Sequence, residues 1–274
     1  MTQRRVASGD GTEPTVKPDV GPNHAQAGEP SRKSRAVSRR VTTQRRTKAV
    51  ARSTHRPEPD SEASLLRQAQ RLSGRTIGEV AAELAVALPT EARRSKGFIG
   101  ALIERALGAS RGSAAGPDFA ALGIELKTIP LSRAGRPRES TFVCTASLRE
   151  IAAQEWHESA VRTKLARVLF VPIEAHAAAA FTDRRIGRPR LWSPTAEQEA
   201  QLRADFEELA GVIGRGEVEL LTAHTGVVLQ IRPKAAHSRE RTRGTDDRGA
   251  ALATLPRGFY LRASFTASLF ADTL

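Results

Sequence analysis

The spacing of the apolar residues changes near residue 110, and this change constrains the fold most. Between residues 64 and 108, apolar side chains recur every three or four positions, which is typical of amphipathic helices. Between residues 123 and 175 they alternate or form short continuous runs, which is typical of strands. A long helical pattern follows over residues 194–213. The order predicts an α/β (α+β) fold, with helices surrounding a mixed sheet.

The individual elements follow from these patterns and from their flanking residues. Ser61 or Ser64 and Thr76 are suited to cap the first two helices, and Gly108 is suited to end the third. Helices are predicted for residues 64–72, 77–88, 96–108, 157–167 and 194–213. Strands are predicted for residues 123–131 (broken at Pro130), 140–148, 168–175, 216–223, 226–233 and 257–263, with a short helix after Ser264. We expect the first two strands to pair as a hairpin, the third to be a buried central strand, and residues 177–192 and 235–250 to be irregular.

The first 58 residues have a different composition. They are rich in Ser, Thr, Pro, Gly and Arg, and they carry no apolar periodicity. Such a segment cannot bury enough apolar surface to offset its loss of conformational entropy on ordering. We therefore expect a disordered basic tail over residues 1–58 and one folded domain over residues 59–274. The tail is either a non-specific nucleic-acid contact or an inert extension.

The charge of the chain indicates a polyanionic partner. The 274 residues carry a formal net charge of +13, which attracts phosphate backbones without reading their sequence. Aromatic residues make up only 4%, which argues against a stacking platform for single strands. The one cysteine, Cys144, excludes an intramolecular disulfide and a cysteine-based metal cluster, and we expect it to be a small buried hydrophobe in a strand. With no apolar run of about 18 residues and no secretory signal, we expect a cytoplasmic protein without a membrane span.

A candidate cutting centre lies in the segment PDFAALGIELKTIP. Asp118 precedes a predicted strand on which Glu125 and Lys127 are two residues apart and therefore share one face, whereas Ile124 and Leu126 point into the core. Two carboxylates can hold a hard cation such as Mg²⁺, which polarises a phosphate and activates water. The lysine can orient that water or stabilise the charge that develops on phosphorus. The pattern is that of restriction-type nucleases, although by itself it also fits an exposed ion pair on an edge strand.

Longer segments carry a more specific resemblance. The run DFAALGIELKTIPLSRAGRPRESTFVC resembles the MutH family of mismatch-repair endonucleases, and the resemblance extends from about Leu65 to Phe270. Other matching segments are LSGRTIGE, KGFIGALIERALGAS, VRTKLARVLFVPIE, RRIGRPRLWSP, LQIRPKAA and TLPRGFYLRASFTASL. The resemblance implies a restriction-endonuclease-like fold with two lobes around a DNA cleft. It also implies a monomer that nicks the unmethylated strand of double-stranded DNA at hemimethylated GATC sites, activated by a MutL-like partner with MutS upstream.

The resemblance also assigns roles to individual residues. It implies that Asp118, Glu125, the helical Glu104 and the main-chain carbonyl of Leu126 bind one or two Mg²⁺ ions. It makes Lys127 the catalytic lysine and places Lys164, which on spacing alone is an exposed helix residue, near the scissile phosphate. The residues implied to contact DNA are Lys96, Gly97, Arg232, Pro233, Lys234 and Tyr260. An arginine can donate two bonds to a guanine edge, and an N6-methyl group would crowd a tyrosine packed against adenine.

Three alternatives stay open at this point. A stand-alone GATC-specific restriction endonuclease would share the metal site, but it should dimerise or contain a second copy of the domain, and the chain has no internal repeat. A DNA-binding module without activity would be favoured if the acidic residues or the lysine were replaced. An unrelated globular domain with a basic tail would not explain the ordered series of matching segments. The chain also lacks HExxH, P-loop and G-x-S-x-G motifs.

Overall fold

The computed structural model describes residues 56–89, 95–109, 116–175, 180–222, 224–234 and 239–270. These residues belong to one compact unit, Val50–Leu274, and a separate unit, Met1–Ala49, lies outside the described residues. The prediction of a disordered tail over residues 1–58 therefore falls almost entirely outside them. None of the described helices is long and apolar enough to span a membrane.

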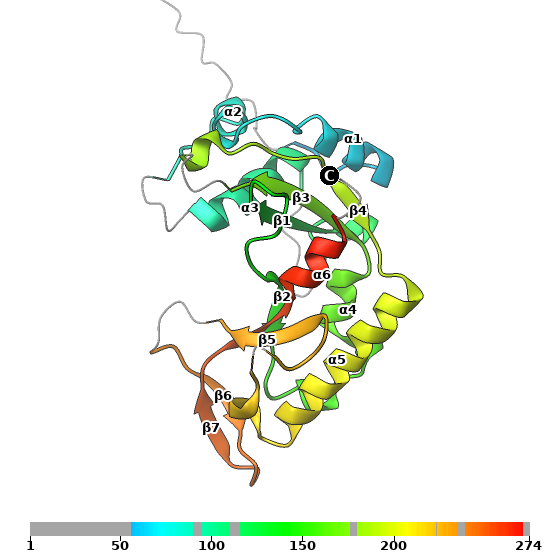
Figure 1. Ribbon diagram of the computed structural model, residues 1–274, viewed down its shortest axis with the longest axis vertical. Helices are drawn as coiled ribbons and strands as arrows, with labels where there is room; N and C mark the ends of the chain where they lie inside the picture. The colour runs from blue at the N-terminus through cyan, green and yellow to red at the C-terminus, as the bar shows by residue number, and fades with distance from the viewer. Residues whose placement is uncertain are drawn as a thin grey trace, which may run out of the picture. The chain divides into compact units, whose positions relative to one another are not determined.

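The first lobe is built on a three-stranded mixed sheet. Its strands are β1 (Glu125–Leu131), β3 (Val168–Glu174) and β4 (Arg190–Trp192), in the order β1-β3-β4, with β1 parallel and β4 antiparallel to β3. The helices that share a core with one face of this sheet are α1 (Glu62–Gln70), α2 (Ile77–Glu83) and α3 (Ser95–Leu107) (Figure 1). The strand β3 is buried at every position except Glu174, so the prediction of a central buried strand is confirmed.

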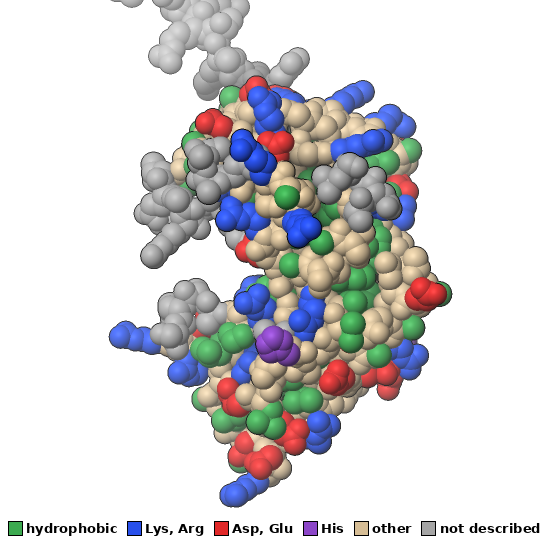
Figure 2. Space-filling model, viewed as in Figure 1, with side chains coloured by type: hydrophobic (Ala, Val, Ile, Leu, Met, Phe, Trp, Pro, Cys, Tyr) green, Lys and Arg blue, Asp and Glu red, His purple; other side chains and the backbone are tan. Residues whose placement is uncertain are grey.

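The second lobe contains an antiparallel sheet with its own core. Its strands are β2 (Thr141–Ala146), β8 (Arg257–Leu261) and β5 (Leu229–Pro233), in the order β2-β8-β5. The long helix α5 (Ala196–Gly214) lies beside this sheet, with α4 (Ala160–Leu165) and α6 (Ala263–Ser268) closer to the first lobe. The strands β6 (Thr242–Thr245) and β7 (Ala251–Thr254) form a separate hairpin. The surface is hollowed between the two lobes, with Lys and Arg side chains on both rims (Figure 2). This arrangement agrees with the predicted α/β class and its two lobes.

The helix ends agree closely with the capping signals. Ser61 caps α1, and Thr76 forms a capping box with Glu79 at the start of α2. Gly108 follows α3 with a φ of +75°, a conformation that glycine adopts without strain. The helix α2 ends earlier than predicted, because Ala85 turns the chain with a φ of +50°. The helix α5 starts at Ala196, two residues later than predicted, because Thr195 is its cap.

The predicted hairpin of the first two strands is wrong. β1 pairs in parallel with β3, in the register Glu125↔Val168, and β2 pairs with β8 in the other lobe. Burial explains the difference, because β1 and β3 bury apolar side chains in both cores, and α4 supplies the crossover that parallel strands need. Pro130 does not break β1, because β1 is an edge strand, where a missing backbone N–H is tolerated.

Two further predictions near the C-terminus are wrong. Within the segment 216–223, residues Val218–Leu220 form a short 3-10 helix and no strand is seen in its described part. The segment 235–250 contains β6, whose polar sequence TRGT gave no alternating apolar signal. Cys144 lies buried in β2, as predicted, and its burial raises the pKa of the thiol to about 11, so it stays protonated at neutral pH.

Candidate active site

The centre of the site is the Glu125 carboxylate, which two lysines hold between them. Glu125 is 2% exposed. Nζ of Lys127 donates to its Oε1 at 2.5 Å, and Nζ of Lys164 donates to its Oε2 at 3.0 Å. Glu125 and Lys127 share a strand face, whereas Ile124 and Leu126 belong to the core of the first lobe, as predicted. Buried charges are stable only when they are paired in this way.

Lys164 reaches Glu125 from α4 and is buried, with 7% of its surface exposed. Its ammonium group also donates to the main-chain carbonyl of Gly116 at 2.8 Å. The prediction from spacing alone, that Lys164 is an exposed residue of a helix, is therefore wrong. Placement beside Glu125 and Lys127 fits what the family resemblance implied. Only the tertiary contact between α4 and the segment before β1 brings the lysine there.

Asp118 is folded back onto β1 by a tight loop. The amide of Phe119 donates to the carbonyl of Ile124 at 2.9 Å, and Gly123 takes a left-handed φ of +66° to close the turn. One carboxylate oxygen of Asp118, Oδ2, accepts the backbone N–H of Leu126 at 2.8 Å. This contact explains how Asp118 and Leu126, eight positions apart in sequence, come to the same end of the strand.

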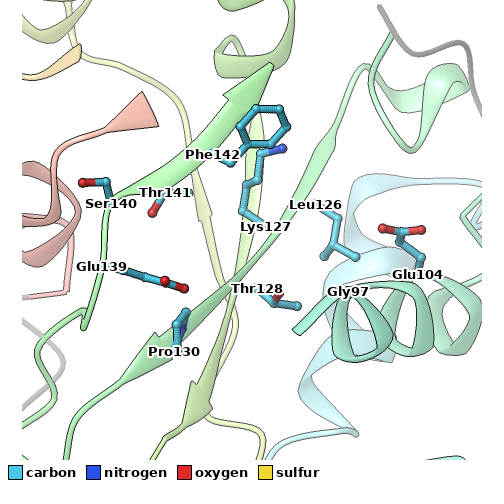
Figure 3. A pocket seen from close by; sticks show the side chains of 11 residues that line it. Gly97, Glu104, Leu126, Lys127, Thr128, Pro130, Glu139, Ser140, Thr141 and Phe142 are labelled. Carbon is cyan, nitrogen blue, oxygen red and sulfur yellow. The ribbon is translucent and has the colours of Figure 1, made fainter. Parts of the chain in front are cut away.

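Glu104 lies on α3, facing the same strand from the side (Figure 3). It lines a pocket of about 240 Å³ together with Leu126 and Lys127. Gly97 and Gly100 lie on the same face of α3, and a Cβ at Gly100 would be 3.9 Å from Oε1 of Glu104. The small residues beside Glu104 therefore leave space next to its carboxylate. Glu139, Ser140, Thr141 and Phe142, which precede or begin β2, complete the opposite wall.

The donor atoms of these residues suit a hard divalent cation. The carboxylates of Glu104, Asp118 and Glu125 and the Leu126 carbonyl all offer oxygen, which Mg²⁺ prefers. Within the described residues, no three acidic, histidine or cysteine side chains are gathered closely enough to hold an ion as they stand. Both oxygens of Glu125 contact lysine ammonium groups instead. The site therefore fits a metal by its chemistry, and an ion bound to Glu125 would share this carboxylate with the two lysines.

The residues expected to contact DNA lie mainly at the open end of the second sheet. Arg232, Pro233 and Lys234 are exposed at the end of β5, and Tyr260 is half-buried on β8. Burial raises the pKa of Tyr260. Burial, together with the charge of Lys127, lowers the pKa of Lys234. Lys127 and Lys234 both lie near the ring of Phe142. Gly97 lines the pocket, and the Lys96 side chain lies outside the described residues.

Phe142 is a site residue that sequence reasoning missed. Its ring meets Tyr260 edge to face, with the centroids 5.3 Å apart, and Nζ of Lys234 lies 3.5 Å from its centroid. Lys127 lies 6.0 Å from the same ring. Phe142 therefore connects the candidate cutting residues to the candidate reading residues. The only sequence signal was an aromatic residue next to a buried Val-Cys pair in a strand.

Gly258 makes room for this aromatic contact, so replacing it by alanine should disturb the site. An added Cβ would lie 2.9 Å from Phe142 Cε2 and 3.2 Å from the carbonyl of Cys144. We expect Gly258→Ala to lower stability by about 1–3 kcal/mol through overpacking and to weaken DNA binding, because both rings must shift. Thermal melting and DNA titration measure the two effects. Gly258 does not take a left-handed φ, so the loss of stability should come from the overpacking and not from backbone strain.

Comparison with known proteins places the chain among mismatch repair enzymes. Residues 107–205 match the family model described as "DNA mismatch repair enzyme MutH". The DNA mismatch repair protein MutH of Salmonella paratyphi C (strain RKS4594) is 53% identical over 213 residues, which are 78% of this chain and 92% of the relative. The corresponding protein of Salmonella newport (strain SL254) is 52% identical over the same shares. The chain belongs to the MutH family. The matched range includes Asp118, Glu125, Lys127 and Lys164, and therefore the Glu125 carboxylate together with both lysines that bind it.

Proposed function

We propose that this MutH-family chain is a methyl-directed mismatch repair endonuclease that nicks the unmethylated strand at hemimethylated GATC sites. The observation that carries the proposal is the pairing of Glu125 with Lys127 and Lys164 beside Asp118, in a chain 53% identical to a curated MutH protein. The family match supports a nuclease acting in DNA repair. The relatives are named as mismatch repair proteins, which does not favour the alternative of a stand-alone restriction enzyme.

Glu104, Asp118, Glu125 and the carbonyl of Leu126 would hold one or two Mg²⁺ ions. Such an ion would supply Lewis-acid polarisation of the scissile phosphate and would make a nearby water more acidic. Lys127, beside Glu125, orients the attacking water. Lys164 stays close to the phosphate and balances the negative charge that develops on phosphorus. The 3′ oxygen leaves, and the product carries a 5′-phosphate at the nick.

Recognition is assigned to the second sheet and the start of α3. Arg232 donates to a base edge in the major groove, Pro233 and Lys234 position it, and Tyr260 senses the target adenine. Lys96 and Gly97 contact the DNA backbone. The positions of Arg232, Lys234 and Tyr260 on the pocket side of the sheet support this division of roles.

The remaining parts of the proposal concern partners and organisation. The protein acts as a monomer on double-stranded DNA in the cytoplasm, at the nucleoid, and is activated by a MutL-like protein after MutS has bound a mismatch. Residues 59–274 form the endonuclease domain. The basic tail of residues 1–58 adds non-specific affinity for DNA, which the net charge of +13 supports.

A nicking assay tests the proposal. Labelled duplexes with one GATC site, unmethylated, hemimethylated or fully methylated, are incubated with the protein and Mg²⁺, with and without a MutL partner. We expect cleavage of the unmethylated strand only, stimulated by the partner and abolished by EDTA. Cutting of both strands without the partner would contradict the repair function, and binding without cutting would contradict the nuclease.

A further inference from the structure

A polar bridge crosses the pocket-facing side of the second sheet. Gln230 on β5 pairs in register with Tyr260 on the central strand β8, and Tyr260 pairs with Phe142 on β2. The neighbouring residues Leu229, Ile231 and Phe259 are buried in the core on the other face. The side chain of Gln230 spans the central strand and donates from Nε2 to Oγ of Ser140 at 2.7 Å. Gln230 is only 4% exposed, so this contact fixes the amide rigidly.

Arg232 approaches the same serine. Its Nη1 lies 3.5 Å from Oγ of Ser140, on the strand face that it shares with Gln230. A serine oxygen has two acceptor positions and one proton to donate. Gln230 occupies one acceptor position, and Arg232 also approaches the oxygen as a donor, so the hydroxyl proton of Ser140 stays available to a third group.

The hydroxyl proton of Ser140 has no acceptor among the described side chains and backbone groups. Ser140 lines the same pocket as Glu104, Leu126 and Lys127, next to the candidate cutting centre (Figure 3). A buried amide and an arginine therefore hold one neutral donor at the edge of this pocket, beside Arg232, to which the proposed function assigns DNA reading.

We propose that Ser140 is a specificity-determining residue that donates a hydrogen bond to an acceptor on a DNA base edge. The inference rests on the proposed function, because it takes the occupant of the pocket to be the target duplex. Serine hydroxyls can donate to base-edge acceptors, and the Ser140 hydroxyl lies beside Arg232, to which the proposed function assigns base reading. Gln230 is a positioning residue, because it acts only through Ser140.

Equilibrium binding tests this assignment without requiring cleavage. The full chain is titrated, without metal, onto fluorescent duplexes that carry GATC or a single changed base pair at each position of the site. We expect Ser140→Ala to weaken GATC binding roughly three- to ten-fold, the value of one hydrogen bond, and to leave binding of an unrelated duplex unchanged. Ser140→Thr, which keeps the hydroxyl, should retain the preference. Ser147→Ala removes an exposed serine hydroxyl beyond the other end of β2 and should behave as wild type.

Two further variants separate direct reading from an effect on Arg232. Gln230→Glu replaces the amide donor with an acceptor for the serine proton. It should therefore weaken the binding preference at the same base pair as Ser140→Ala does. In an Arg232→Ala background, Ser140→Ala should still cause its additional loss. Absence of that loss would show that Ser140 only orients Arg232 and would overturn the proposal. An equal loss on every duplex would indicate a phosphate contact and would also overturn it.

Failure of the proposed function gives a different result. If the wild-type chain binds GATC no better than other sequences, the proposed function is wrong, and the role of Ser140 in base recognition is wrong with it. If the wild type prefers GATC and Ser140→Ala prefers it equally, only the role of Ser140 is wrong. Far-UV circular dichroism of each variant, with the Ser140→Thr result, excludes misfolding as the cause of a loss.

Discussion

Asp118→Asn is expected to lower the nicking rate more than a hundred-fold while DNA affinity changes little. Loss of a group that supports a metal ligand typically costs about 10–100-fold, and a direct ligand should exceed that range. Binding should persist because it depends mainly on basic residues and on the second sheet. The asparagine oxygen can still accept the backbone N–H of Leu126, so the loop before β1 should keep its shape. Single-turnover nicking and DNA titration measure the two quantities separately.

Two companion variants sharpen this expectation. Asp118→Ala removes the contact to Leu126 as well as the charge, so it should lose activity equally but also melt at a lower temperature. Asp183→Asn, at an exposed aspartate of the first lobe, should change neither quantity. Nicking by Asp118→Ala at the wild-type rate would show that the metal site lies elsewhere.

Asp205→Ala is expected to have the largest effect on stability. Asp205 is 2% exposed on α5, and its carboxylate accepts the backbone amides of Val227, Val228 and Leu229 at 2.7–2.9 Å. It also accepts from Nε2 of Gln201 at 2.9 Å. A buried amide left without an acceptor costs roughly 1–3 kcal/mol, so stranding these amides should cost about 3 kcal/mol or more. For a domain of this size, the melting temperature should fall by roughly 6–12 °C.

A neighbouring acid on the same helix provides the control for Asp205. Glu207 is exposed and pairs with Arg203 one turn before it, so Glu207→Ala should leave the melting temperature nearly unchanged. Thermal melting followed by circular dichroism compares the two variants. Equal melting temperatures would show that solvent satisfies the three amides and that Asp205 does not anchor them.

Local signals in the sequence predicted the ends of several elements. Thr76 and Gly108 determine a helix start and a helix end through contacts within a few residues, so their effects do not depend on the rest of the fold. The alternation of Glu125, Leu126 and Lys127 predicted which side chains face the core for the same reason. Strand pairing was not predictable in this way, because the partners of β1 and β2 are set by burial against segments far along the chain.

The site residues also fall into two groups, those that the sequence indicated and those that only the tertiary structure shows. The motif and the family resemblance indicated Asp118, Glu125 and Lys127, and the structure brings them together with Lys164. The burial of Lys164 and the ring of Phe142 could not be read from residue spacing, because both depend on elements that meet only in three dimensions. The assigned roles of these residues remain predictions that the variants above will test.

The anchoring of β5 by Asp205 has a consequence for how target preference can evolve. The strand is held at Leu229, at its buried end, whereas Arg232, Pro233 and Lys234 are exposed at the other end. Substitutions at the exposed tip therefore leave the anchor and the core untouched. Libraries randomised at these three positions should yield many folded proteins, and under the proposed function some of them should prefer other DNA sequences.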